Sequence, residues 1–357
     1  MAPTRVLVVS NMIPGKGAPY YGAFVAAHVR ELQRDPRLQV EFVGIDDPQK
    51  GRARALVKYG RLFAALAERL CAFRPEVVHY HYALPTALPA PLVSRLCGTP
   101  YVVTLHGGDF YQMRARLVGG RMLLTRVLCD ATEIIAVSEA LARDVAASLP
   151  HAHPPVTVVN MGVDLARFAA VRAGPLHRLA YVGQLIRRKG VDIALQALAE
   201  LRRTAPACTL TVIGDGPEAR ALEALAARLG IAPAVTFTGG LPPERVAAAL
   251  DGHGVLLVPS RAEPLGLVAL EGMAAGLIVV TSGAGGLAEL VRADNGVTVG
   301  DHNGAAWARC LAGLQSMPAS DQERLRAAAR RTAAAHAVSE KVAAVSRILR
   351  AAAGRGD

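Results

Sequence analysis

The chain has 357 residues, of which 52% are hydrophobic, 19% are charged and only 4% are aromatic. That length suits about two domains with buried cores, and the apolar content excludes an intrinsically disordered chain. The formal net charge of +11 suits an anionic partner. However, no zinc-ligand spacing, RNP pattern or basic reading helix accompanies the charge, so nucleic acid is not expected as a partner.

The first predicted element is a short apolar run, Val6 to Val9, which ends at Ser10 and Asn11. It is too short for the core of a signal peptide and predicts a first β-strand. No window approaches the ~18 to 20 apolar residues of a membrane-spanning helix. The five cysteines have no CxxC spacing, which favours reduced thiols and a cytoplasmic protein.

Short β-branched runs then alternate with Ala- and Leu-rich helical stretches along the whole chain. The first series of predicted strands covers 5–9, 39–43, 77–81, 101–105, 134–137 and 156–159. The second series covers 179–183, 208–213, 235–238, 255–258, 278–281 and 297–299. Short strands joined by helical crossovers indicate parallel sheets with helices on both faces. The predicted fold class is therefore α/β, with two doubly wound units of six strands each.

The domain boundaries follow from these two series. We expect an N-terminal domain at 1–165, a linker at 166–178 that lacks a strand signal, and a second domain at 179–337. The segment 338–357 contains a further helix with apolar residues at helical spacing and no strand after it. Such an appended helix could return to the N-terminal domain.

The loop between the predicted strand 255–258 and the next helix carries two carboxylates. Open parallel sheets bind ligands beyond the C-terminal ends of their strands. A helix that begins near Gly266 offers free amides at Leu267 and Val268 for a phosphate. Glu271, about a turn further, could accept hydrogen bonds from ribose hydroxyls, and Glu263 could reach a second polyol. This segment alone fits equally well a solvated Glu263 and a Glu271 that is favoured by the helix dipole.

A second loop of the same sheet follows the strand 179–183 and carries Arg187, Arg188 and Lys189. Three cations beside a helix start suggest a diphosphate clamp. A solvated basic loop is the alternative interpretation. The position of the loop at a strand C-terminus of the same sheet favours the clamp.

In the first domain, His106 stands beside two glycines after the strand 101–105, where the backbone could approach a ligand closely. A structural histidine that closes a turn is the alternative. The loop 11–22, which ends at Gly22 before a predicted helix 23–32, is another possible phosphate or sugar cradle. Its glycines do not form GxGxxG, so a dinucleotide fingerprint is not supported.

His79 and His81 lie on one face of the strand 77–81. A metal would need further ligands, and no Cys, His or Asp cluster is spaced to provide them. No bound metal and no other cofactor are expected.

Taken in order, these segments resemble the large fourth family of retaining glycosyltransferases, which have the GT-B fold. The matching pieces are Gly22 to Val25, Thr104 to Asp109, Ile135 to Ser138, Asn160 to Asp164 with Phe168, Val182 to Gly190, Gly214 to Pro217, and the Glu263-x7-Glu271 loop. The resemblance covers most of the chain. It implies two Rossmann-like domains that face each other across a cleft, with a nucleotide-sugar donor bound mainly by the second domain and a hydroxyl acceptor mainly by the first.

The resemblance also implies roles for individual residues. Glu271 would hold the ribose, Glu263 the hydroxyls of the transferred sugar, and Lys189 with the amides of Leu267 and Val268 the diphosphate. His106 and Gly22 would close the site from the first domain. This chain has Gln184 where the family often has an arginine, and Arg188 is expected to supply part of that charge.

The reaction that the resemblance implies is a retaining, metal-independent transfer of a hexose-type sugar, without a protein nucleophile. A UDP-sugar is favoured as the donor, with GDP-mannose next, and the acceptor would be a glycan, a lipid-linked sugar or a small molecule. Synthesis of a polysaccharide or cell-envelope glycan is the expected setting. Transfer to a natural-product acceptor such as an aminocyclitol, a UDP-sugar epimerase, and a non-catalytic sugar-nucleotide-binding subunit are the alternatives.

A basic helix is predicted at 113–128, with arginines among apolar residues. It could contact the anionic surface at the inner face of a membrane, or a phosphorylated acceptor. An ordinary amphipathic helix with a solvated basic face is the other interpretation.

Overall fold

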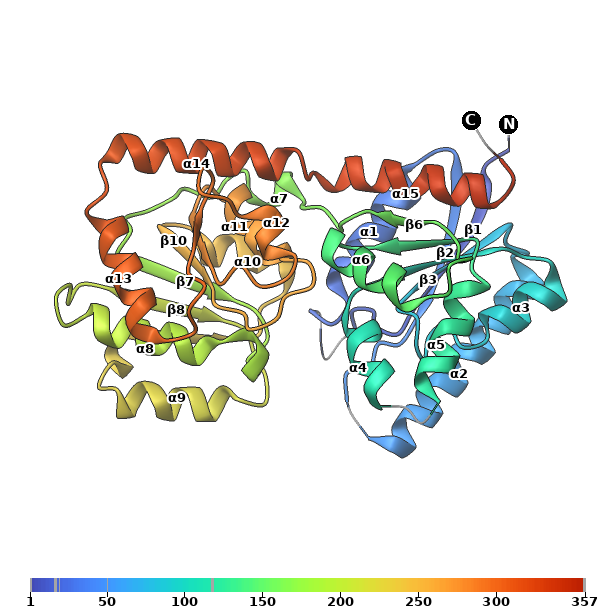
Figure 1. Cartoon of the computed structure of the whole chain (residues 1–357), viewed down its shortest axis with the longest axis horizontal. Coiled ribbons are helices and arrows are strands. Elements are labelled where there is room, and N and C mark those ends of the chain that lie inside the picture. The colour runs from blue at the N-terminus through green and yellow to red at the C-terminus, as the bar shows by residue number, and fades with distance from the viewer. Residues whose placement is uncertain (1, 16–17, 19, 50, 117–118, 356–357) are drawn as a thin grey trace. The chain divides into compact units, whose positions relative to one another are not determined.

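A computed structural model of the chain describes residues 2–355 except 16–17, 19, 50 and 117–118. The chain divides into two compact units, the first made of Met1–Met161 with Val338–Asp357 and the second of Gly162–Ala337. Each unit is a parallel six-stranded sheet covered by helices (Figure 1). The division after Met161 lies before the expected linker, and the short helix α7 (Leu165–Phe168) is the first helix of the second unit.

The sheet of the first unit has the strand order β2-β1-β3-β4-β5-β6. Its strands are β1 (Thr4–Ser10), β2 (Leu38–Gly44), β3 (Val77–His81), β4 (Tyr101–Leu105), β5 (Glu133–Ala136) and β6 (Val156–Val158). Its helices are α1 (Ala23–Arg34), α2 (Arg52–Ala72), α3 (Ala90–Cys97), α4 (Gly108–Arg116), α5 (Gly120–Cys129), α6 (Glu139–Ser148) and α15 (Val338–Ala352).

Helix α15 comes last in the chain but packs in the first unit, against α1, β3 and β4 (Figure 1). Its apolar face, with Val342, Val345 and Leu349, is buried in the same core as the β-branched residues of β1. Beyond that face, Ser346 Oγ donates a hydrogen bond to Asp35 at 2.6 Å. The helix is therefore part of the core of the first unit. Burial of side chains of this size contributes about 1.5 to 3 kcal/mol each to the stability of the unit.

The sheet of the second unit has the strand order β12-β11-β10-β7-β8-β9. Its strands are β7 (Arg178–Val182), β8 (Thr209–Ile213), β9 (Val235–Gly239), β10 (Val255–Val258), β11 (Ile278–Thr281) and β12 (Val297–Thr298). Besides α7, its α-helices are α8 (Val191–Leu201), α9 (Ala219–Arg228), α10 (Pro243–Leu250), α11 (Leu267–Ala274), α12 (Leu287–Leu290), α13 (Gly304–Gln315) and α14 (Ala319–Ala334). Two short 3-10 helices, η1 (Arg187–Lys189) and η2 (Ala232–Ala234), complete the described elements.

All twelve predicted strands are confirmed to within about a residue at each end, and so is the α/β fold class. The strands are readable from the sequence because parallel strands are covered on both faces and are therefore continuous apolar runs. The buried patterns of β1, β3, β4, β10 and β11 show this directly.

The prediction of one basic helix over 113–128 is wrong. Helix α4 ends at Arg116, and a separate helix α5 begins after Gly119, which has a φ of 72°. A left-handed backbone at this position ends the continuous helical path, and glycine adopts it without strain. Residues 117–118 and the side chains of 113–118 lie outside the described part of the structure. Within the described part, none of the helices combines the length and the hydropathy that a bilayer span requires.

Candidate active site

The order of the second sheet reverses between β7 and β10, and ligands of open α/β sheets bind beyond the strand ends at such a point. The loops that follow these two strands are in backbone contact, since a Cβ on Gly190 would lie 2.0 Å from the carbonyl oxygen of Pro259. Arg261 N also donates to Arg188 O at 2.7 Å. The two loops therefore hold each other in fixed positions.

Arg261 strengthens this connection with its side chain. Its guanidinium donates to both carboxylate oxygens of Asp192, at 2.8 and 2.7 Å, and to the carbonyl oxygen of Arg187 at 2.8 Å. The hydrogen bond with Asp192 raises the pKa of Arg261. Because a bidentate pair fixes direction as well as distance, the loop after β10 is clamped onto the start of α8.

Lys189 and Glu263 meet at the centre of these loops and form an ion pair. Their side chains are 19% and 11% exposed, so the pair is largely shielded from water. Ser260 Oγ donates to the same carboxylate oxygen of Glu263 at 3.3 Å. On the backbone side, Gly286 N donates to Glu263 O at 2.9 Å. The structure thus brings together two of the residues that the sequence placed on separate loops.

The amino end of helix α11 lies directly after this loop. Gly266 caps the helix with a φ of 81° and without a side-chain hydrogen bond. The first amides of any α-helix have no acceptor within the helix, so the amides of Leu267 and Val268 can receive an anion. A Cβ on Gly266 would lie 2.9 Å from a methyl group of Leu287, and this contact together with the positive φ favours glycine at the position.

Glu271 lies one turn further along α11 and is partly buried. Burial raises the pKa of Glu271 to about 7, although the positive charge of Arg167 partly offsets the effect. The carboxyl therefore changes its protonation state close to neutral pH. A perturbed carboxyl beside an anion-binding helix end is typical of a ligand site.

In the first sheet the order reverses between β1 and β3, and a second group of predicted residues lies there. Gly22 caps α1 with a φ of 67°, and a Cβ on it would lie 2.4 Å from Met12 O. Tyr82 has a φ of 74°, donates its hydroxyl to Met12 Sδ at 3.2 Å and places its ring 4.4 Å from the ring of His106. Gly22, Tyr82 and His106 thus converge on one edge of the first sheet.

Asp109 fixes the backbone around His106. Its Oδ1 accepts a hydrogen bond from His106 N at 3.0 Å, and its Oδ2 accepts one from Ala83 N at 2.9 Å. Burial raises the pKa of Asp109 to about 6 against the lowering effect of these backbone bonds. Burial also lowers the pKa of His106 to about 3, so this imidazole is neutral at physiological pH.

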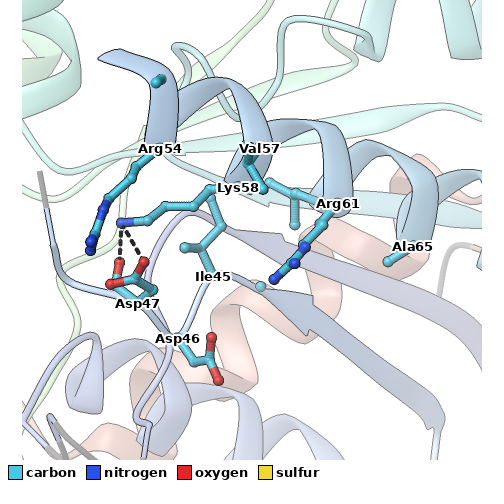
Figure 2. A pocket seen from close by; sticks show the side chains of 11 residues that line it. Ile45, Asp46, Asp47, Arg54, Val57, Lys58, Arg61 and Ala65 are labelled. Carbon is cyan, nitrogen blue, oxygen red and sulfur yellow. Dashed lines mark hydrogen bonds and ion pairs between the residues drawn. The ribbon is translucent and has the colours of Figure 1, made fainter. Parts of the chain in front are cut away.

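A concavity of about 500 Å³ lies beyond the carboxyl end of β2, between its loop and helix α2 (Figure 2). Arg54, Lys58 and Arg61 extend over it from α2, and Asp46 and Asp47 lie on the opposite wall (Figure 2). Lys58 Nζ lies 3.2 Å from Asp47 Oδ2. The mixture of donors and acceptors suits a ligand with many hydroxyl groups.

Sequence reasoning missed Tyr82, Asp109 and this concavity. The helical spacing of Arg54, Lys58 and Arg61 was a usable signal, because it places three cations on one face of α2. The positive φ of Tyr82 has no signal in the residue type, since aromatic residues rarely adopt it. Among the described residues, no group of three or more His, Cys, Asp and Glu side chains is arranged to hold a metal ion.

Two protein-family models together match most of the chain. The family model for glycosyl transferases group 1 matches residues 166–332, and the model for glycosyltransferase family 4 matches residues 20–167. A GDP-mannose-dependent alpha-(1-6)-phosphatidylinositol monomannoside mannosyltransferase of Mycolicibacterium smegmatis is 33% identical over 324 residues, which are 80% of this chain and 82% of the relative.

A glycogen synthase of Mycobacterium tuberculosis is 33% identical over 270 residues, which are 73% of this chain and 65% of the relative. The chain thus spans slightly less than two thirds of that relative's length. Among solved structures, Anabaena HepE in complex with UDP superposes with a TM-score of 0.75 at 18% identity, covering 98% of this chain and 100% of the other. At that identity the likeness shows the fold alone, which is GT-B.

Proposed function

The chain belongs to the group 1 glycosyltransferases of family 4, and on this premise we propose that it transfers a sugar from a nucleotide-diphosphate sugar to a hydroxyl group of an acceptor. The observation that carries the proposal is the ion pair of Lys189 and Glu263 beside the open amino end of α11. A cation, two amides and carboxylates from two adjoining loops and the start of α11 match the phosphates and hydroxyls of such a donor.

Each part of the donor has a partner in the second unit. The diphosphate would bind Lys189 and the amides of Leu267 and Val268, with Arg188 adding positive charge from the same loop. Glu263 would accept hydrogen bonds from the transferred sugar, and its fixed backbone orients it for that task. Glu271 would accept hydrogen bonds from the hydroxyl groups of the ribose, one helical turn from the phosphates.

Charge development explains how this arrangement would accelerate the transfer. As the bond between the anomeric carbon and the phosphate oxygen breaks, negative charge grows on the diphosphate and positive charge on the sugar ring. Lys189 and the helix amides stabilise the first, and the Glu263 carboxylate stabilises the second, more strongly in the transition state than in the ground state. We propose that this replaces a divalent metal.

We further propose that the configuration at the anomeric carbon is retained. The acceptor oxygen would form its bond on the face that the phosphate leaves, and the acceptor proton would pass to the departing phosphate oxygen. No protein nucleophile is needed in this step. A hexose on a UDP carrier is the first donor to test, and GDP-mannose is the next, because the Mycolicibacterium relative is named for it.

The acceptor is proposed to bind the first unit, in the concavity beside α2 (Figure 2). Asp46 and Asp47 can accept from hydroxyls, while Arg54 and Arg61 can donate to hydroxyls or to an anionic substituent. The name of the Mycolicibacterium relative contains a phosphate-bearing acceptor, and the glycogen synthase similarity favours a glycan. An aminocyclitol acceptor is the alternative for this pocket.

Cytoplasmic location with contact to an anionic membrane is a separate proposal for the first unit. Leu92 and Leu96 on α3 are 61% and 76% exposed, and Met122 on α5 is 71% exposed next to the exposed Arg121. Exposed apolar side chains beside cations suit a membrane surface. Flotation with anionic vesicles at low salt tests this, and absence of the protein from the vesicle fraction would contradict it.

The proposed function is tested by a thermal-shift screen with UDP-, GDP- and dTDP-sugars, followed by mass spectrometry of mixtures of the stabilising donor with a panel of acceptors. We expect one donor class to stabilise the protein and a glycosylated acceptor to appear. Interconversion of the free donors without any acceptor would indicate an epimerase. Donor binding without any chemical change in either assay would indicate a binding subunit.

A further inference from the structure

Four histidines of the first unit lie ring to ring beneath the edge that carries Gly22 and Tyr82. They are His28 on α1, His79 and His81 on β3, and His106 after β4. The ring of His81 lies 4.4 Å from that of His79, 5.6 Å from that of His28 and 5.3 Å from that of His106. Burial lowers the pKa of His81 well below its ordinary value, so its ring is neutral.

One hydrogen bond joins the buried His81 to His106, the histidine of the cluster that belongs to the candidate site. His81 Nδ1 and His106 Nε2 are 3.1 Å apart, and the two ring planes are inclined by only 22°. His79 instead bonds to Thr104 Oγ1 through its Nε2 at 2.8 Å. The other nitrogen of His81, Nε2, is buried and has no hydrogen-bond partner in the described structure.

Heavy-atom positions allow two pairs of tautomers for this bond between neutral imidazoles, because either ring can be the donor. If His106 donated from Nε2, the only proton of His81 would be on its own Nε2, as a buried N–H without an acceptor. If His81 donates from Nδ1, its Nε2 is a bare lone pair and no N–H of His81 is left unsatisfied. Orphaned buried donors are rarer than under-satisfied acceptors, which favours the second arrangement.

We propose that His81 is a positioning residue, which donates its Nδ1–H to Nε2 of His106 and thereby fixes His106 in the tautomer that carries its proton on Nδ1. His106 is partly exposed, and we infer that it offers this Nδ1–H to a ligand. This step rests on the proposed function: the Nδ1–H of His106 would donate a hydrogen bond to a hydroxyl oxygen of the substrate. Asp109 fixes the backbone of His106, and His81 fixes its proton.

The test uses the full chain labelled with ¹⁵N-histidine, in which protonated and bare ring nitrogens resonate in separate spectral regions. His106→Gln identifies the His106 signals. We expect Nδ1 to be the protonated nitrogen of His106 in the wild type and in His81→Asn, whose side-chain amide can donate from the same place. In His81→Leu, which removes the donor, the His106 signals should shift to a mixture of tautomers. His79→Leu, which removes a buried imidazole bonded to Thr104, is the matched control and should leave them unchanged.

A His106 that is protonated on Nε2 in the wild type would overturn the proposal, even if His81→Leu failed to fold. Unchanged His106 signals in His81→Leu, or equal changes in His79→Leu, would overturn it as well. If the transfer reaction is established, His81→Leu should lower kcat about tenfold with little change in the donor KM, and His81→Asn should restore most of it. The nitrogen spectra need no substrate, so they test the histidine pair even if the proposed function fails.

Discussion

Lys189 and Glu263 stand 74 positions apart in the chain and form an ion pair where the order of the second sheet reverses. The pair lies between two loops that share backbone hydrogen bonds, and beside the amino end of α11. A partly shielded cation with a fixed position costs little reorganisation when a diphosphate approaches. Lys189 is therefore the first residue of the donor site to test.

Lys189→Ala should weaken the binding of UDP or GDP about 10- to 100-fold, because a charge-assisted contact to phosphate contributes about 1.5 to 3 kcal/mol. Isothermal titration calorimetry measures this directly. Arg220→Ala removes an exposed cation on α9 of the same unit and is the matched control. Equal affinities of Lys189→Ala and the wild type for both nucleotides would show that the diphosphate does not bind here.

Glu271→Gln should change how stability depends on pH. The pKa of Glu271 is raised to about 7 by burial, so the folded protein binds this proton more tightly than the unfolded chain does. That contribution is fully present below pH ~4.5 and is lost as pH rises through ~7. Relative to the wild type, the variant should therefore gain about 1 to 2 kcal/mol in unfolding free energy between pH 5 and pH 8. Urea unfolding at the two pH values tests this, and an unchanged difference would contradict it.

His28→Leu should protect the first unit from acid. Burial lowers the pKa of His28 to about 4, so the unfolded chain binds this proton more tightly and stability falls as pH drops from ~6.5 to ~4. Both ring nitrogens of His28 are buried without partners in the described structure, so leucine removes no hydrogen bond. Thermal melting should show a larger stabilisation at pH 5 than at pH 8. The exposed His302, changed to Gln, is the matched control, and an effect of His28→Leu that does not depend on pH would contradict this explanation.

Arg61→Ala should raise the KM for the acceptor about tenfold and leave UDP affinity unchanged, because Arg61 lines the concavity of the first unit alone. Arg52→Ala removes an exposed cation from the first turn of the same helix, outside the concavity, and serves as the control. Steady-state kinetics with the acceptor identified in the panel gives both constants. Equal acceptor KM values for the two variants would place the acceptor elsewhere.

Much of the fold was predictable because the central strands β1, β3, β4, β10 and β11 are buried apolar runs, and every run predicted as a strand formed one. The proximity of Lys189 and Glu263 was predictable because the strand ends of one parallel sheet share an edge, which places the two residues on neighbouring loops. The break at Gly119 was missed because apolar spacing continues on both sides of it. The ion pair itself could not be predicted, because residue spacing does not show whether a loop cation contacts a carboxylate or solvent.

The contact between His81 and His106 likewise could not be predicted from residue spacing. His81 and His106 can bond only because β3 and β4 pair with His81 opposite Thr104, a register that is set by tertiary packing. From the sequence, His79 and His81 were an unexplained pair on one strand face. Asp109 likewise looked like part of a glycine turn. Its carboxylate accepts hydrogen bonds from His106 N and Phe110 N within that turn, and a third from Ala83 N, which ties the turn to the segment after β3.

We propose that the loops that carry Lys189 and Glu263 hold a sugar donor during transfer without a metal. The most direct measurement is the release of nucleoside diphosphate from the nucleotide sugar that stabilises the protein in the thermal-shift screen. It is made with the acceptor present and EDTA in excess, for the wild type and for Glu263→Gln. We expect full activity of the wild type in EDTA and a loss of at least about 100-fold in Glu263→Gln with nucleotide affinity preserved. Wild-type activity that disappears in EDTA and returns with Mn²⁺, or a Glu263→Gln variant as active as the wild type, would contradict it.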